Sequence, residues 1–133
     1  MSYLKAYIGA LIVFGAIDAT WLSTMGPIVY RPALAEILAP NLRVAPAIAF
    51  YLMYPVGIVV FAITPALRSE STASAFMLAL LFGAIAYATY DLTNYAILRA
   101  WTLQITILDI GYGALTSGVA AIAGLLLVRF TTR

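Results

Sequence analysis

Three carboxylic acids stand inside strongly hydrophobic stretches of the chain: Asp18, Asp91 and Asp109. If those stretches cross a membrane, each carboxyl lies in or near lipid, where a charged side chain is costly. It persists there when it is protonated, paired or facing water, so an intramembrane acid marks a functional site by default. The chemistry open to such groups is ligand binding, proton exchange, or general acid and base catalysis.

The composition places these acids in a membrane protein. The 133 residues are 65% hydrophobic and 9% charged, whereas an average soluble domain has about 45–50% and about 25%. Mean hydropathy is +1.04. The net charge of +2 comes without a run of basic residues, so nucleic acid is not an expected partner. Cysteine and histidine are both absent, and we expect no disulfide, no metal and no cofactor.

Four segments are long and apolar enough to span a bilayer, which takes about 20 mostly apolar residues. The sequence therefore predicts an all-α membrane protein, a four-helix transmembrane bundle in a single domain. The predicted spans are residues 3–25, 43–66, 72–98 and 102–128. Gly26 and Pro27 are expected to end the first span. Pro55 is expected to bend the second and to free a carbonyl near Tyr51.

The segment between the first two spans, residues 28–38, is too short to cross the membrane. It carries Arg31 and Glu36 among apolar residues. Pro32 can occupy the first turn of a short helix, and Pro40 stops it. We expect a short interfacial or re-entrant segment that covers the end of the bundle holding the aspartates. An ordered loop is the equally weighted alternative.

An even number of spans places both chain ends on one side of the membrane. The basic residues divide almost evenly between the sides, with four on the side of the termini and three on the other: Lys5, Arg68, Arg129 and Arg133 against Arg31, Arg43 and Arg99. Basic residues accumulate on the cytoplasmic side. We therefore expect both termini to lie in the cytoplasm.

All three aspartates fall in the half of the membrane away from the chain ends, because the helices alternate in direction and rise 1.5 Å per residue. Helical spacing puts polar and aromatic residues near these acids. The candidate ligand or proton site combines the acids with one amide and five aromatic residues: Asp18, Asp91, Asp109, Asn94, Trp21, Tyr51, Tyr54, Tyr87 and Tyr90. Arg31, Arg43 and Arg99 belong to the same side and are the candidate counter-charges.

Small residues recur at a spacing of four, as at Gly113 and Ser117 and at Ala79 and Gly83. They let helices approach closely, and we expect them to serve packing within the bundle. The polar residues allow a structural interpretation as well, since tyrosines, Asn94 and threonines can hold helices together by hydrogen bonds. Three acids at one depth exceed what packing needs, which favours a functional polar cavity.

Three strings carry a resemblance to a known family: FGAIDATWLSTMGPIVYRPAL, YATYDLTNYAILRAW and LDIGYGALTSG. They resemble the bacterial membrane family called domain of unknown function 2177, and the likeness covers almost the whole chain. The matching residues are Asp18, Trp21, Gly26, Tyr30, Tyr90, Asp91, Thr93, Asn94, Trp101, Asp109 and Gly113. That family has no assigned activity, so the resemblance implies a four-helix membrane protein and no reaction. It also implies a bacterial cytoplasmic (inner) membrane as the expected location.

Three classes of function stay open. The preferred one is binding, or proton-coupled transport, of a small molecule or lipid in an aspartate-lined cavity. The alternatives are a structural or accessory subunit of a membrane complex and a component of a lipid-modifying enzyme. No diagnostic catalytic motif marks the chain as an enzyme, and no catalytic residue is assigned. The expected partners are membrane lipid and a small-molecule or lipid ligand, with further copies of the chain or a larger complex left open.

Overall fold

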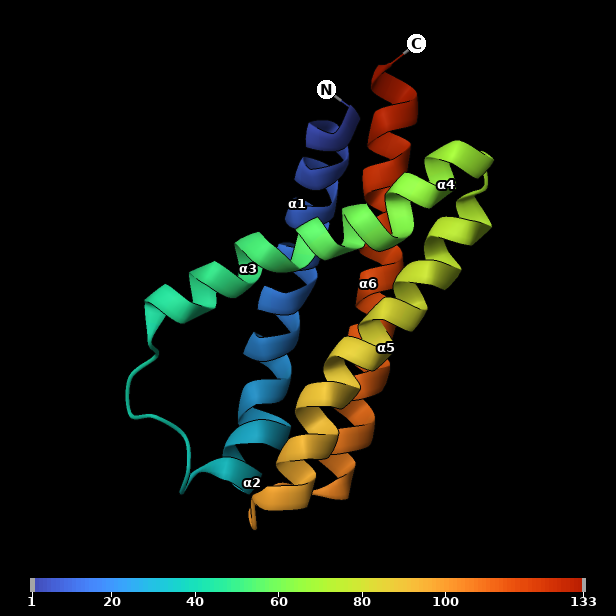
Figure 1. Cartoon of the computed structure of the whole chain (residues 1–133). Helices are drawn as coiled ribbons and strands as arrows, with labels where there is room; N and C mark the ends of the chain where they lie inside the picture. The colour runs from blue at the N-terminus through green and yellow to red at the C-terminus, as the bar shows by residue number, and fades with distance from the viewer. Residues whose placement is uncertain (1, 133) are drawn as a thin grey trace.

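The computed structural model describes residues 2–132, which form long helices joined by short connections (Figure 1). A helix satisfies its backbone hydrogen bonds within the segment, as a lipid environment requires. Residues 2–132 contain no strand, and four helical runs are long and apolar enough to cross a membrane. The prediction of an all-α protein with four membrane-spanning helices is confirmed.

The first run is longer than the sequence predicts. Helix α1 (Ser2–Met25) continues through a π-helical turn, η1 (Gly26–Tyr30), into the short helix α2 (Arg31–Leu34). The prediction that Gly26 and Pro27 end the helix was wrong. The helical turn there encloses one residue more than an α-helical turn, and the N–H of Arg31 donates to the carbonyl of Gly26. Pro27 lies in the first turn of this π segment, where a proline is tolerated.

The short segment expected after the first span is therefore joined to it. Leu34 of α2 is buried against Trp101 and Ile105. Trp101 belongs to the connection between α5 (Thr72–Ile97) and α6 (Leu103–Thr131), and Ile105 lies near the start of α6. That connection is at the end of the bundle away from the chain termini (Figure 1). The chain then turns through residues 35–38 and reaches the second run by a non-helical stretch up to Arg43.

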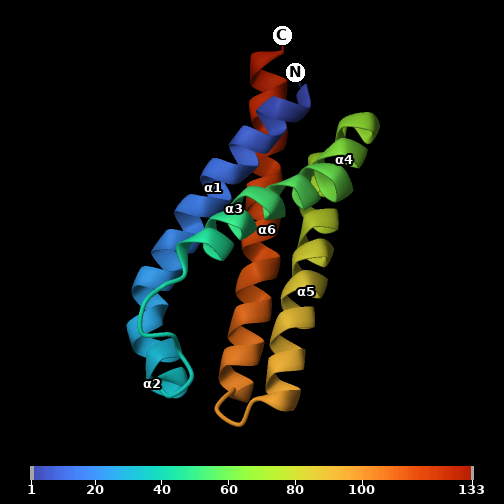
Figure 2. The same ribbon diagram turned by 60° about the vertical axis from the view of Figure 1, so that its left-hand side comes forward.

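The second run consists of α3 (Val44–Ile58), a second π turn, η2 (Val59–Ile63), and α4 (Thr64–Ser69). Pro55 lies inside α3, and the π turn follows it. The hydroxyl of Tyr7 donates to the carbonyl of Leu52 at 2.8 Å, so a side chain of α1 satisfies a carbonyl close to the proline. This run crosses the other helices obliquely (Figures 1 and 2), and Figure 1 shows the start of α3 standing away from them.

Helices α5 (Thr72–Ile97) and α6 (Leu103–Thr131) form an antiparallel pair. Each begins at a hydroxyl cap, which satisfies a backbone N–H that has no partner within the helix. The oxygen of Ser71 accepts from the N–H of Ser74, and the oxygen of Thr102 accepts from the N–H of Ile105, both at 3.1 Å. The two chain ends lie together at the opposite end of the bundle from the α5–α6 connection (Figure 2).

Helix α6 lies at the centre, with backbone contacts on two sides. A Cβ added at Gly83 of α5 would lie 2.5 Å from Oγ of Ser117 and 2.6 Å from the carbonyl oxygen of Gly113. The predicted use of these small residues in packing within the bundle is confirmed. On the other side, a Cβ at Gly9 of α1 would come within 2.9 Å of Cα of Gly124.

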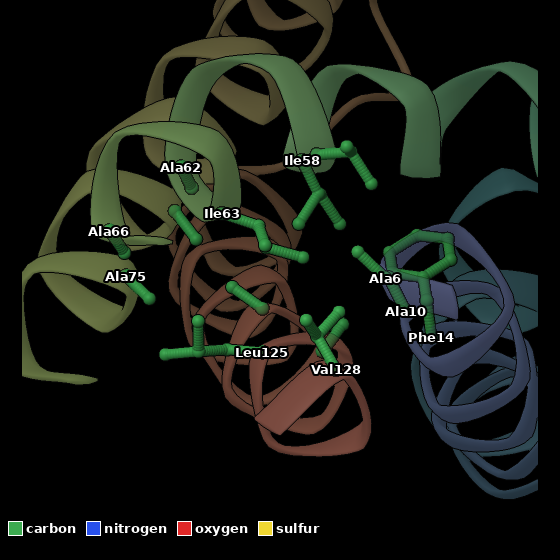
Figure 3. Packing of buried hydrophobic residues seen from close by; sticks show 14 of the residues in the cluster. Ala6, Ala10, Phe14, Ile58, Ala62, Ile63, Ala66, Ala75, Leu125 and Val128 are labelled. Carbon is green, nitrogen blue, oxygen red and sulfur yellow. The ribbon is translucent and has the colours of Figure 1, made fainter. Parts of the chain in front are cut away.

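An apolar core fills the half of the bundle nearer the chain ends. Figure 3 shows Phe14 of α1, Ile58 and Ile63 of the second run, and Leu125 and Val128 of α6 pointing toward one another. No carboxyl lies in this cluster. The packed apolar half holds the helices together, and the other half is left for the acids.

Adding a methyl group at Gly124 should separate α1 from α6. The Cβ of Gly124→Ala would lie 2.6 Å from the carbonyl oxygen of Ala6 and 2.7 Å from Cδ1 of Ile63. We expect the free energy of unfolding to fall by about 1–3 kcal/mol, as for other overpacked cores. Denaturant or thermal unfolding in detergent measures it. Gly111→Ala on the same helix is the control, because its Cβ meets nothing within 4 Å. Equal stability of the two variants would contradict the close contact.

Candidate functional site

Asp18 accepts hydrogen bonds from tyrosines of two other helices. Its Oδ1 accepts from the hydroxyl of Tyr112 of α6 at 2.6 Å, and its Oδ2 accepts from the hydroxyl of Tyr51 of α3. Only 7% of the residue is exposed. Hydrogen bonds to an ionised acceptor are roughly twice as strong as neutral ones. One carboxyl from α1 thus joins three of the helical runs.

Asp109 ends a second chain of hydrogen bonds. Its Oδ1 accepts from the hydroxyl of Tyr30 at 2.7 Å, and the Tyr30 oxygen accepts from the indole N–H of Trp21 at 2.9 Å. Tyr30 is the last residue of η1, so the continued first run delivers this donor. The ring of Trp21 stacks on Tyr112 with centroids 4.2 Å apart. The stacked pair links the surroundings of Asp109 to those of Asp18.

Asp91 is fully buried, and no donor among residues 2–132 reaches either of its oxygens. Its neighbour is another acid, Asp109. Two adjacent carboxyls in a buried place cannot both be ionised without a large cost. A single proton shared between them would give Asp91 the hydrogen bond that it lacks.

A cavity of about 730 Å³ opens beside these groups and is lined by both Asp18 and Asp109. Side chains from all four helical runs form its walls. Seven of the fifteen lining residues are aromatic: Tyr30, Phe50, Tyr54, Phe82, Tyr87, Tyr90 and Trp101. Asp91 does not line it and lies beside Asp109 instead. The volume falls in the range of about 300–1,000 Å³ that is usual for small-molecule sites.

No lysine or arginine lines the cavity. The candidate counter-charges Arg31, Arg43 and Arg99 are all exposed. Tyrosine hydroxyls, not arginines, donate the hydrogen bonds that Asp18 and Asp109 receive. The structure therefore corrects the expectation that these three arginines neutralise the acids.

One donor in the cavity wall has no acceptor. The indole N–H of Trp101 is buried and makes no hydrogen bond within residues 2–132. An unmade bond of this kind costs about 1–3 kcal/mol, whereas an uncompensated buried charge costs about 3–5 kcal/mol. The unpartnered indole donor is thus a smaller demand on the site than an unpaired ionised carboxyl would be.

The other predicted site residues take different places. Tyr54 shares a hydrogen bond of 2.6 Å with Ser117, and the ring of Tyr87 packs on Gly113. Tyr90 meets Trp101 edge to face, with centroids 5.5 Å apart. Asn94 is partly exposed and does not line the cavity.

Two donors were absent from the predicted site. Tyr112 stands three residues after Asp109 on one helix, and that spacing could have indicated it. Tyr30 lies outside the four predicted spans and was matched only through the family resemblance. Trp101 was matched only through the family resemblance, since no helical spacing ties it to an acid.

Comparison with known proteins bears on the membrane setting. The family model described as predicted membrane protein (DUF2177) matches residues 3–126. The chain belongs to this family. No curated protein and no solved structure matches it. Membership in DUF2177 confirms the resemblance predicted from the sequence and supports an integral membrane protein.

Removing one hydroxyl tests the hydrogen bonds to Asp18. Tyr112→Phe in this DUF2177 protein keeps the ring that stacks on Trp21 but leaves the carboxyl with one donor fewer. We expect the free energy of unfolding to fall by about 1.5–3 kcal/mol, the usual contribution of a hydrogen bond to a charged group. Tyr95→Phe is the control, because Tyr95 is exposed on α5. If both variants unfold like the wild type, Asp18 does not depend on this donor.

The shared proton can be detected by infrared spectroscopy. The wild type should show the C=O stretch of a protonated carboxyl at neutral pH, and Asp91→Asn should abolish it. The variant should keep its stability, because an amide N–H can donate to Asp109 in place of the acid proton. Asp18→Asn is the comparison and should leave the band unchanged. A band that survives in Asp91→Asn and disappears in Asp18→Asn would place the proton elsewhere.

Proposed function

We propose that this protein binds a small amphipathic molecule or a membrane lipid in the cavity beside Asp18 and Asp109. The observation that carries the proposal is a cavity of about 730 Å³ with aromatic walls and two carboxyls. Ligand sites usually combine mostly apolar walls with a few polar groups that fix orientation. A purely structural role for the acids accounts for their hydrogen bonds but not for the space beside them.

The position of the cavity suits a ligand that arrives through the lipid. Two of its lining residues, Leu22 and Met53, are 50% and 67% exposed. Both belong to runs that are apolar enough to span the membrane, so acyl chains surround them. A hydrophobic molecule reaches the carboxyls from the bilayer without first entering water.

The pair of Asp91 and Asp109 supplies a means of coupling ligand binding to proton exchange. Asp109 lines the cavity, and Asp91 lies beside it. A ligand that engages Asp109 competes for the proton held between the two acids. Such competition is the element that proton-coupled transport needs, and acidic residues serve this role in membrane transporters.

The same proposal includes a location. We place the bundle in a bacterial cytoplasmic membrane with both termini in the cytoplasm. Lys5, Arg68 and Arg129 are the described basic residues at the terminal end, and basic residues favour the cytoplasmic side. Arg133, which was counted with them, lies outside the described residues.

Filling the cavity tests the proposal. Ala86 lines it, so Ala86→Phe should occupy the space and exclude a ligand. Native mass spectrometry of protein purified in mild detergent should show a retained ligand on the wild type and its loss from this variant. Ala96→Phe is the matched control, because Ala96 is exposed on the same helix. Retention that is equal in both variants, or absent from the wild type even after incubation with membrane lipid extract, would favour an accessory subunit instead.

A further inference from the structure

We propose that the ligand of this cavity is a lipophilic cation, with an amine or onium group on an apolar body. The inference rests on the proposed function and adds the charge of the ligand. Binding of an amphipathic molecule requires only the space and the apolar walls. The charge follows from which polar groups face that space and which are missing from it.

The carboxyls give the cavity a negative charge that nothing in it balances. Asp18 accepts hydrogen bonds from two tyrosine hydroxyls and Asp109 accepts one, and none of these donors carries a positive charge. The lining contains no lysine or arginine. A phosphate or carboxylate head group would be repelled, and a neutral one would leave the charge unpaired. A cation supplies the missing counter-charge.

The aromatic walls favour the same ligand. Tyr54 and Tyr87 meet at 90° with centroids 5.9 Å apart, and Tyr90 and Trp101 meet at 89°. Rings at right angles present both edges and faces around one space. The face of an aromatic ring attracts a cation within about 6 Å, and cages of such rings recognise quaternary ammonium groups.

A second feature points to a partner that residues 2–132 do not supply. Trp101 lines the cavity and is 7% exposed, and its indole nitrogen is buried with no acceptor within residues 2–132. Buried donors in folded proteins almost always find a partner. An oxygen acceptor on the bound molecule, such as a hydroxyl or an ether, would satisfy this donor if the indole turns toward the cavity.

Protons should compete with the cation for the same carboxyls. Asp18 is faced by Tyr51 of α3 and Tyr112 of α6, and Asp109 is faced by Tyr30 of η1 and Asp91 of α5. All of these neighbours are neutral or acidic. Because no basic group shields the acids, the affinity for a cation should fall as the pH falls.

Three probes of similar shape and different charge test the inference. They are tetraphenylphosphonium, the neutral triphenylphosphine oxide and the anion tetraphenylborate. The chain has two tryptophans, and Trp101 lines the cavity, so quenching of intrinsic fluorescence reports binding in detergent. Protein-free micelles correct for partition. The cation should bind at least about tenfold more tightly than the neutral probe, which corresponds to about 1.4 kcal/mol.

Two variants connect that preference to the carboxyls. Asp18→Asn and Asp109→Asn should each lower the affinity for the cation at least about tenfold, or about 1.4 kcal/mol. The affinity for the neutral probe should stay unchanged. Glu70→Gln is the control, since Glu70 lies in the α4–α5 turn at the other end of the bundle. If a variant does not fold, the pH dependence of the wild type decides, with loss of affinity on acidification for the cation alone.

The outcomes separate this inference from the proposed function. Equal affinity for the cation and the neutral probe would overturn the charge preference and leave the binding function in place. Failure of the cation to bind a wild type that still retains its own ligand would also overturn the inference alone. The proposed function fails only if the wild type retains no ligand.

Discussion

A carboxylate inside lipid must find within the protein the donors that water would otherwise supply, and the arrangement of this bundle follows from that need. Asp18 obtains its donors from α3 and α6, so the acid fixes three helical runs at the depth of one side chain. The stacked Trp21 and Tyr112 extend the same network toward Asp109. The tyrosines that satisfy the acids are large, and they stand between helices that pack closely elsewhere. The hydrogen bonds to the carboxyls and the cavity beside them therefore result from one arrangement of the helices.

Two π turns adapt the helices to this network. In η1 the extra residue lets the first run pass Gly26 and Pro27 and brings Tyr30 to Asp109. In η2 the second run changes its helical geometry after Pro55, and Ile63, the last residue of η2, packs against Gly124 of α6. Turns of this kind are often found at functional sites. Here η1 carries two residues that line the cavity, Gly26 and Tyr30.

The composition and the length of the apolar segments predict an all-α membrane protein, because lipid leaves the backbone few alternatives to a helix. The shared depth of the three acids follows from counting residues along alternating helices. The sequence could not predict which groups satisfy the acids, because the chain has nine tyrosines and spacing along one helix does not identify partners on another. The three arginines were predicted as counter-charges because they belong to the same side of the membrane as the acids. They are exposed, and tyrosine hydroxyls donate to the acids instead. The rule that proline ends a helix failed at Pro27, because it assumes that the helix keeps α geometry on both sides.

Because the second run is oblique, the bilayer thickness that matches the protein differs from one side of the bundle to the other. Its 26 residues, Val44–Ser69, measure about 39 Å at about 1.5 Å per residue, and the hydrocarbon layer is about 30 Å thick. A helix that leans covers less thickness than its length, and the bilayer thins to meet it once the spare length is used. Helix α6 makes no such demand. The lipid bordering α3 should therefore be thinner than the lipid on the opposite side, and hydrophobic mismatch would be concentrated where the cavity opens.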